Sequence, residues 1–286
     1  MSMGFFVCLL ASQLTDVNNI LSPKAMVAIL SPLLSSESIV LLIVRSVLLA
    51  VSLLLAFIFG GLVCALRPRH RDNVHMFAKI FSSVAPILGI KVIVRRHKDV
   101  QDGPYIFLAN HQNNFDLFTH TAAVPKGTVS LGKKSLLWMP LFGQIYWLSG
   151  NILIDRKNRH SAFDTMSKTV EKIKQNNLSV WIFPEGTRSR GRGLLPFKAG
   201  AFHTAIAAGV PVVPVVASCQ SHIKLNRWNN GVVIIDMMAP VPTADVDKTE
   251  VKNFSAQIHA SMSAKFAEIN QEAAALMGKT LTSDDV

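Results

Sequence analysis

A chain of 286 residues is long enough for one large α/β domain with an appendage, and it does not need disulfides or metals to support a core. Half of the residues are hydrophobic and only 16% are charged, yet the formal net charge is +11; this balance is unusual for a fully soluble protein and favours membrane attachment with negatively charged partners. The three cysteines lie far apart, without a CxxC pair or a neighbouring histidine cluster, so neither a zinc site nor a disulfide framework is predicted, and a reducing compartment fits best.

The chain begins with a segment that has no recognisable role. Residues 1–38 fit no targeting pattern, because the apolar run FFVCLLA lacks the cationic flank of a secretory signal, and they are treated as an unassigned extension. No charged residue occurs from position 46 to 66, a length that matches a bilayer's hydrocarbon core at about 1.5 Å per residue. This stretch predicts a membrane helix, with a buried core helix as the alternative. Arginines follow within 67–71, so the positive-inside rule places the rest of the chain in the cytoplasm.

Residues 73–89 repeat apolar side chains every three or four positions, which predicts an amphipathic helix. Its apolar face could pack on a globular domain or lie in the headgroup layer of a membrane. The cations that flank it, between positions 67 and 98, favour membrane contact with an anionic leaflet. Residues 39–89 are therefore interpreted as a membrane-anchoring helical segment.

Seven short runs rich in β-branched residues follow, interleaved with helical patterns. They are KVIVRR, PYIFLAN, GTVSLG, NILID, LSVWIF, VPVVPVV and GVVIID. Apolar strands of this kind are typical of a largely parallel sheet flanked by helices, so residues 90–277 are predicted to form an α/β domain. An Ala-rich stretch from 248 to 277 predicts a closing helix, and residues 278–286 predict a disordered tail.

The run PYIFLAN leads directly into HQNNFD, which contains His111 and Asp116. Open α/β folds place their ligands where strands end. If His111 lies in the loop and Asp116 in the first turn of a helix, the carboxylate can fix one ring nitrogen while the other takes a proton from a hydroxyl. This is the base half of a catalytic triad without a protein nucleophile. The alternative is a hydrogen-bonded loop histidine that caps the helix.

Residues 127–135, GTVSLGKKS, almost match a phosphate-binding P-loop. Lys134 stands where serine or threonine should ligate magnesium, so a P-loop nucleotidase is excluded. The segment is interpreted instead as a strand and a turn that present Lys133 and Lys134. The apolar stretch SLLWMPLFG after it suits either the path of an apolar chain or core packing.

Residues 181–200, WIFPEGTRSRGRGLLPFKAG, contain a loop punctuated by proline and glycine after another strand. The loop carries Arg188, Arg190, Arg192 and Lys198, and arginine can bind a phosphate through two parallel hydrogen bonds. A phosphate site is therefore predicted. A merely solvated loop would account for Arg190 and Arg192, but it accounts poorly for FPEGTR.

Five blocks taken together are more specific than any one of them. In order and spacing, HQNNFD, GKKSLLWMPLFG, GNILIDR, FPEGTRSRGRGLLPFKAG and VPVVPV closely resemble the motifs of bacterial 1-acyl-sn-glycerol-3-phosphate acyltransferases, the lysophosphatidate acyltransferases of the glycerolipid acyltransferase superfamily. The resemblance covers residues 44–274. It implies that His111 is the general base and that Asp116 orients it. It further implies a phosphate cradle of Lys133, Arg156, Arg188 and Lys198, a loop shaped by Glu185, Gly186 and Thr187, and a strand end and acyl pocket shaped by Pro214.

The resemblance also implies a reaction and a place. An acyl group would pass directly from acyl carrier protein or coenzyme A to the sn-2 hydroxyl of lysophosphatidate, giving phosphatidate for phospholipid synthesis without a cofactor or metal. The expected site is the cytoplasmic face of the bacterial inner membrane. Two alternatives are an acyltransferase for glycerol 3-phosphate or another lysolipid, and a membrane-anchored nucleic-acid-binding module. No nucleic acid is predicted as a partner, because tyrosine and tryptophan are few and the cations gather in Gly/Pro loops.

Overall fold

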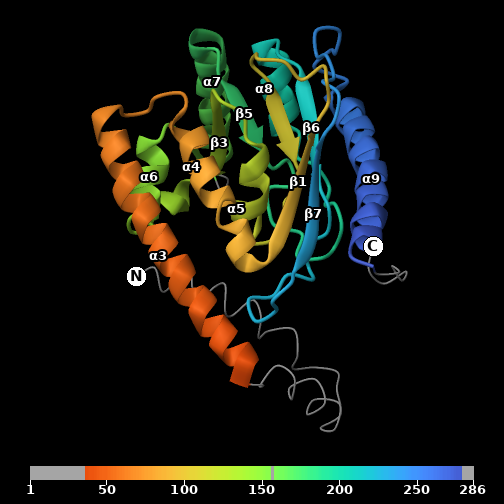
Figure 1. Cartoon of the computed structure of the whole chain (residues 1–286). Helices are drawn as coiled ribbons and strands as arrows, with labels where there is room; N and C mark the ends of the chain where they lie inside the picture. The colour runs from red at the N-terminus through yellow and green to blue at the C-terminus, as the bar shows by residue number, and fades with distance from the viewer. Residues whose placement is uncertain (1–35, 156–157, 279–286) are drawn as a thin grey trace.

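The computed structural model describes residues 36–155 and 158–278, in which a seven-stranded sheet lies between two layers of helices (Figure 1). The N-terminal extension, Arg156 and the C-terminal tail lie wholly or mostly outside these residues. The strands are β1 (Ile90–Arg96), β2 (Ile106–Ala109), β3 (Thr128–Lys133), β4 (Ile152–Ile154), β5 (Ser179–Ile182), β6 (Val212–Ala217) and β7 (Gly231–Met237). The α-helices are α3 (Ser36–Leu66), α4 (Asn73–Ser82), α5 (Asp116–Thr119), α6 (Phe142–Leu148), α7 (Arg159–Asn176), α8 (Gly200–Ala208) and α9 (Val251–Leu276), and the 3₁₀ turns are η1 (Ala85–Leu88), η2 (His120–Ala123) and η3 (Lys134–Trp138).

All seven predicted strands are present, and their order across the sheet is β1-β7-β6-β2-β5-β3-β4. Neighbouring strands are parallel except β6 and β7, so β1 and β7 run opposite to the other five. The prediction of a largely parallel sheet flanked by helices is confirmed. Because parallel strands end at the same edge, the loops after β2, β3, β5 and β6 converge there.

Both faces of the sheet centre are covered, because alternate residues of a strand point to opposite helical layers. Ile106 and Leu108 of β2 pack in the core beneath α7, α8 and α9. Phe107 and Ala109 pack in the core beneath α3, α4 and α5. Every residue of β2, β5 and β6 is consequently buried, which explains why these strands read as uninterrupted apolar runs.

Helix α3 contains the predicted membrane helix but begins earlier, at Ser36. Among the described helices it is the one long and apolar enough to cross a membrane. One side of it packs against the domain along its length (Figure 1), through Leu41, Arg45, Leu49, Ala56 and Cys64, which are all buried. The guanidinium of Arg45 donates hydrogen bonds to the carbonyl oxygens of Leu225 (3.0 Å) and Trp228 (2.8 Å), so α3 is tied to the β6–β7 connection. The other side of α3 exposes a stripe of large apolar side chains.

The predicted helix over 73–89 is broken into α4 and η1. Pro86 has no amide hydrogen and its ring would clash with the carbonyl four residues earlier, which is where α4 ends, at Ser82. Gly89 then ends η1 with a φ of 70°, a conformation that favours glycine. Phe77, Phe81 and Leu88 of the apolar face are buried within the protein. The expectation that this face contacts a membrane is therefore wrong, because α3 and the sheet already cover it.

Candidate active site

The residues of HQNNFD lie at the sheet edge where the five parallel strands end, in the loop between β2 and α5 (Figure 1). His111 is in the loop and Asp116 is the first residue of α5, which is the arrangement under which the sequence allows the two to meet. The side chain of Asn113 accepts a hydrogen bond from the backbone N–H of Phe115 (2.8 Å), which forms the turn between them. The pair therefore meets because the chain reverses within the motif.

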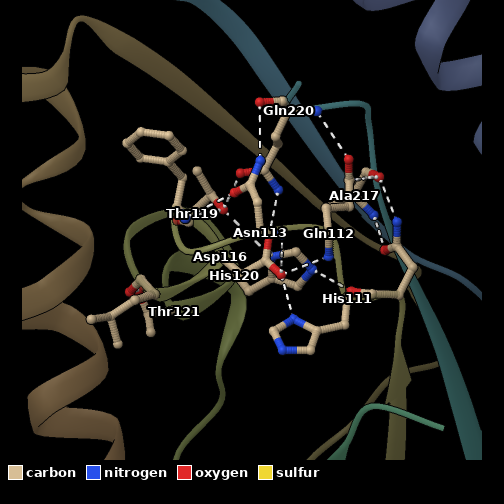
Figure 2. Close-up of polar contacts among 12 residues, drawn as sticks. His111, Gln112, Asn113, Asp116, Thr119, His120, Thr121, Ala217 and Gln220 are labelled. Carbon is tan, nitrogen blue, oxygen red and sulfur yellow. Dashed lines mark hydrogen bonds and ion pairs between the residues drawn. The ribbon is translucent and has the colours of Figure 1, made fainter. Parts of the chain in front are cut away.

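His111 and Asp116 form a short hydrogen bond (Figure 2). Nδ1 of His111 lies 2.5 Å from Oδ2 of Asp116. A carboxylate only accepts, so Nδ1 carries the hydrogen and Nε2 of a neutral His111 ring keeps a free electron pair. The His111 side chain is 20% exposed, whereas that of Asp116 is 4% exposed. The arrangement presents an acceptor nitrogen at the surface and hides the charge that orients it.

Asp116 is ionised despite its burial. Burial alone would raise the pKa of this carboxyl, but the nearby His120 and His111 rings and the backbone N–H of Gln112 outweigh it, and the pKa is lowered. Oδ2 accepts from the backbone N–H groups of Gln112 (2.8 Å) and Asn113 (3.3 Å) in addition to His111. A charged, fully oriented carboxylate can stabilise a proton on the His111 ring.

A second histidine, His120, was not predicted as part of the site. It is buried, its Nε2 lies 2.9 Å from the carbonyl oxygen of Asn110, and its Nδ1 lies 3.6 Å from Oδ1 of Asp116. Burial lowers the pKa of His120, although the charge of Asp116 opposes this, and Nε2 carries the hydrogen that the carbonyl oxygen of Asn110 accepts. Phe183 packs on both rings, stacked on His111 with ring centroids 4.1 Å apart and edge-on to His120. Only the spacing of four residues from Asp116 hints at this contact in the sequence.

Glu185 joins the HQNNFD loop to the FPEGTR loop. Its two carboxylate oxygens accept hydrogen bonds from the backbone N–H groups of His111 (2.7 Å) and Leu195 (3.0 Å). The side chain is buried, and burial raises its pKa to about 7 although both N–H groups favour the charged form. Backbone bonds from Ser189 N to His111 O and from Arg190 N to Gln112 O link the same two loops. Glu185 therefore holds the HQNNFD loop and the FPEGTR loop together through their backbones.

The raised pKa of Glu185 predicts a pH-dependent stability. Between pH 4.5, the ordinary value for this carboxyl, and about 7, the folded protein binds a proton that the unfolded chain has lost. Stability from this group is therefore full at low pH and is lost as the pH rises through this window. Relative to Glu185→Gln, the melting temperature of the wild type should fall by about 5 °C from pH 4.5 to 7.5. The exposed Glu171 provides the control: Glu171→Gln should melt in parallel with the wild type, and a parallel Glu185→Gln curve would contradict the assignment.

Two of the predicted cationic residues, Arg188 and Lys198, lie in or against the FPEGTR loop. Arg188 is partly buried, and its Nε has no hydrogen-bond partner among the described residues, which is costly unless an anion binds there. The ammonium group of Lys198 lies over Gly186, where an added Cβ would be 2.8 Å from Nζ, and Gly186 has a φ of 70°. The structure thus brings Arg188 and Lys198 to the loop that Glu185 ties to His111.

Other predicted residues are less closely tied to the dyad. Lys133 ends β3, in register with Ile154 of β4, and is exposed, as is Thr187. Pro214 lies within β6, in register with Leu108 of β2, and is therefore inside the sheet and not at its edge. Lys134 begins η3 and is exposed. Arg156 lies outside the described residues.

The stretch that carries these strands and loops matches a known family. Residues 91–218 match the family model described as Acyltransferase, so the fold and the site define an acyltransferase. The chain is 47% identical over 236 residues to the 1-acyl-sn-glycerol-3-phosphate acyltransferases of Salmonella typhimurium and Escherichia coli, covering 82% of this chain and 96% of each relative. It belongs to the 1-acyl-sn-glycerol-3-phosphate acyltransferase family. The crystal structure of the 1-acyl-sn-glycerophosphate acyltransferase PlsC from Thermotoga maritima has a similar fold, with a TM-score of 0.63, 23% identity, and coverage of 81% of this chain and 95% of that one.

Proposed function

We propose that this protein transfers an acyl group from a thioester to the sn-2 hydroxyl of 1-acyl-sn-glycerol 3-phosphate and so makes phosphatidate. The observation that carries the proposal is the short bond between His111 Nδ1 and Asp116 Oδ2, which leaves Nε2 free beside a cationic loop. Relatives that are 47% identical over most of their length bear the name of this activity. The same activity accounts for an apolar anchor helix, because the acceptor resides in a membrane.

The dyad supports direct transfer. Nε2 of His111 takes the proton of the sn-2 hydroxyl while that oxygen attacks the thioester carbon, and the imidazolium formed is stabilised by Asp116. When the carbon–sulfur bond breaks, the same proton passes to the departing thiolate, so phosphatidate and a free thiol result. Because the substrate supplies the hydroxyl, the scheme requires no nucleophile from the protein and no cofactor. Acyl carrier protein and coenzyme A are the proposed thiol carriers.

Arg188 is proposed to bind the phosphate of the acceptor, with Lys198, Lys133 and Arg156 completing a cationic cradle. The support is the unpartnered, buried Nε of Arg188 in a loop held against His111 by Glu185. A phosphate bound here would place the glycerol within reach of His111. Gly186 and Thr187 would shape this loop, and Pro214 would stiffen the sheet beneath the acyl chain.

Arg188→Ala should raise the KM for lysophosphatidate about 10- to 100-fold with a smaller change in kcat, because one charge-assisted contact to the phosphate is lost. Arg190→Ala is the matched control, since Arg190 lies two residues away and is exposed. Initial rates over a range of acceptor concentrations measure both constants. An unchanged KM in Arg188→Ala, or an equal effect in Arg190→Ala, would remove Arg188 from the phosphate site.

The membrane association follows from α3. The domain packs against one side of α3. If α3 crossed the membrane perpendicular to its plane, the domain would have to enter the bilayer. We therefore propose that α3 lies along one leaflet, with its exposed apolar side chains in lipid. Trp138 and Leu141 are exposed beside it, and Phe142 of α6 contacts Phe57 of α3 with ring centroids 6.4 Å apart. The arginines within 67–71 would meet anionic headgroups. The cytoplasmic leaflet of a bacterial inner membrane is the proposed place.

The proposed function is tested by the release of thiol from acyl carrier protein or coenzyme A thioesters by the purified protein. Release should require lysophosphatidate, and phosphatidate should appear in equal amount. Glycerol 3-phosphate and other lysolipids, supplied as competitors, separate this acceptor from its closest rivals. Thiol release that is indifferent to lysophosphatidate, or that occurs only with another acceptor, would refute the assignment.

A further inference from the structure

Gln220 contacts the dyad from a part of the chain that no sequence motif assigns to it. It follows β6, 104 residues after Asp116 in sequence, and it is fully buried. Its side-chain Nε2 donates a hydrogen bond to Oδ1 of Asp116 at 3.0 Å (Figure 2). His111, Gln112 and Asn113 all bond to the other oxygen, Oδ2. Gln220 is therefore the one hydrogen-bond donor to Oδ1 among the described residues.

The carboxylate of Asp116 fixes the orientation of the Gln220 amide. Its Oε1 lies 3.0 Å from the hydroxyl of Thr119, which can donate, whereas the carboxylate of Asp116 can only accept. A flipped amide would place Oε1 against Oδ1, so that two acceptors would face each other and the bond to Asp116 would be lost. The amide nitrogen consequently faces Asp116, and Oε1 lies within hydrogen-bond distance of the Thr119 hydroxyl on the other side.

The backbone of Gln220 is held by the same loop that carries His111. Its N–H donates to Oε1 of Gln112 at 2.9 Å, and its carbonyl oxygen accepts from Nδ2 of Asn113 at 3.1 Å. The side chain of Gln112 also donates to the carbonyl oxygens of Ala217 (2.9 Å) and Ser218 (2.7 Å). The segment after β6 and the HQNNFD loop thus form one interlocked unit, in which Gln220 cannot move independently of the dyad.

We propose that Gln220 is a positioning residue for acyl transfer, whose amide holds Oδ1 of Asp116 so that Oδ2 stays directed at Nδ1 of His111. This inference rests on the proposed function for its catalytic meaning. Without the amide, Oδ1 would be a buried charged oxygen with no hydrogen-bond donor, and its nearest polar neighbour would be Nδ1 of His120 at 3.6 Å. The carboxylate would then keep its bond to His111 with a less fixed orientation, and its less dispersed charge would hold the proton on the imidazolium more tightly.

Four ionisable groups share this pocket and enter the test. They are Asp116 on α5, His111 in the HQNNFD loop, His120 on η2, and Glu185 in the loop after β5. Gln220 bonds to Asp116 alone among them. Substitution of Gln220 should therefore change the protonation of His111 through Asp116 alone. The hydrogen bond between Glu185 and the backbone of His111 should be kept.

The experiment compares Gln220→Leu and Gln220→Glu with Ser221→Ala, a control at the adjacent exposed position. Gln220→Leu should lower kcat about 10- to 100-fold, with the KM for lysophosphatidate within twofold of the wild type, because Arg188 and Lys198 are untouched. The acidic limb of the pH–rate profile should move to higher pH, and further in Gln220→Glu, which adds an acceptor against Asp116. Ser221→Ala should match the wild type. A kcat that is unchanged, or that falls equally at every pH as a misfolded fraction would cause, would overturn the proposal.

A measurement without turnover separates this inference from the proposed function. Diethyl pyrocarbonate modifies the unprotonated imidazole, and peptide mass spectrometry gives the rate at His111 as a function of pH. The midpoint should lie about 0.5 to 1 pH unit higher in Gln220→Leu than in the wild type. Thr119→Val, which replaces the hydroxyl bonded to Oε1 of Gln220 by a methyl group, should shift it in the same direction and serves if Gln220→Leu does not fold. Unmoved midpoints would refute the role of Gln220 even in a protein that transfers no acyl group, whereas missing thiol release in the wild type would refute the function alone.

Discussion

His111→Ala is expected to lower turnover by ~10² to 10⁴, which is the range that a positioned general base contributes. Its Nε2 is the acceptor nitrogen that the dyad presents at the sheet edge, so no neighbouring group can replace it. Folding and membrane attachment should be retained, because the ring is partly exposed and the backbone N–H of His111 keeps its bond to Glu185. Initial rates of phosphatidate formation measure the loss of turnover. Melting curves verify folding, and membrane flotation verifies attachment.

The matched control for this variant is His203→Ala, which removes an exposed imidazole from α8 and should leave turnover unchanged. Residual activity in His111→Ala should also lose the acidic limb of the wild-type pH profile. Turnover close to that of the wild type would exclude His111 as the base, whatever its distance from Asp116.

Asp116→Asn is expected to lower kcat about 10³-fold, although the two side chains have the same shape. Oδ1 and Oδ2 accept hydrogen bonds from Gln220, His111 and two backbone N–H groups, and an amide nitrogen in place of either oxygen would face donors. A neutral side chain would also not stabilise the imidazolium. The KM for lysophosphatidate should change little, since the proposed phosphate contacts lie in another loop.

A second histidine–aspartate pair in the protein supplies the control for Asp116→Asn. His160 and Asp164 lie on the surface of α7 with Nδ1 and Oδ2 3.2 Å apart, and both side chains are exposed. An exposed pair of this kind contributes little, so Asp164→Asn should affect neither activity nor stability measurably. If Asp116→Asn kept more than about a tenth of the wild-type kcat, the orienting role of Asp116 would be wrong.

The layers of the fold could be predicted because they depend on local periodicity. The seven apolar runs correspond to the seven strands. In the loop after PYIFLAN, His111 contacts Asp116 because asparagines favour the turn between them. The direction of β1 and β7 could not be predicted, since it depends on which strands pair across the sheet. The break at Pro86 was predictable in principle and was missed because the apolar period continues across it.

The support around the dyad was not accessible from local patterns. Glu185 looked like part of a phosphate loop, but it accepts from the backbone of His111, 74 residues away in sequence. Gln220 looked like an ordinary residue after a strand, and only the three-dimensional arrangement shows its amide on Asp116. His120 is only four residues after Asp116 in sequence. Its burial and the short distance from its Nδ1 to Oδ1 of Asp116 nevertheless depend on the tertiary structure. A sequence pattern can thus indicate the reacting groups more readily than the groups that hold them.

The most direct test of the account is a crystal structure of the protein with lysophosphatidate bound and no acyl donor present. The sn-2 hydroxyl should lie about 3 Å from Nε2 of His111, within hydrogen-bond reach, while the phosphate contacts the guanidinium of Arg188. A bound acceptor whose hydroxyl is separated from the His111 ring by Phe183 or by the sheet, or whose phosphate lies away from Arg188, would contradict it.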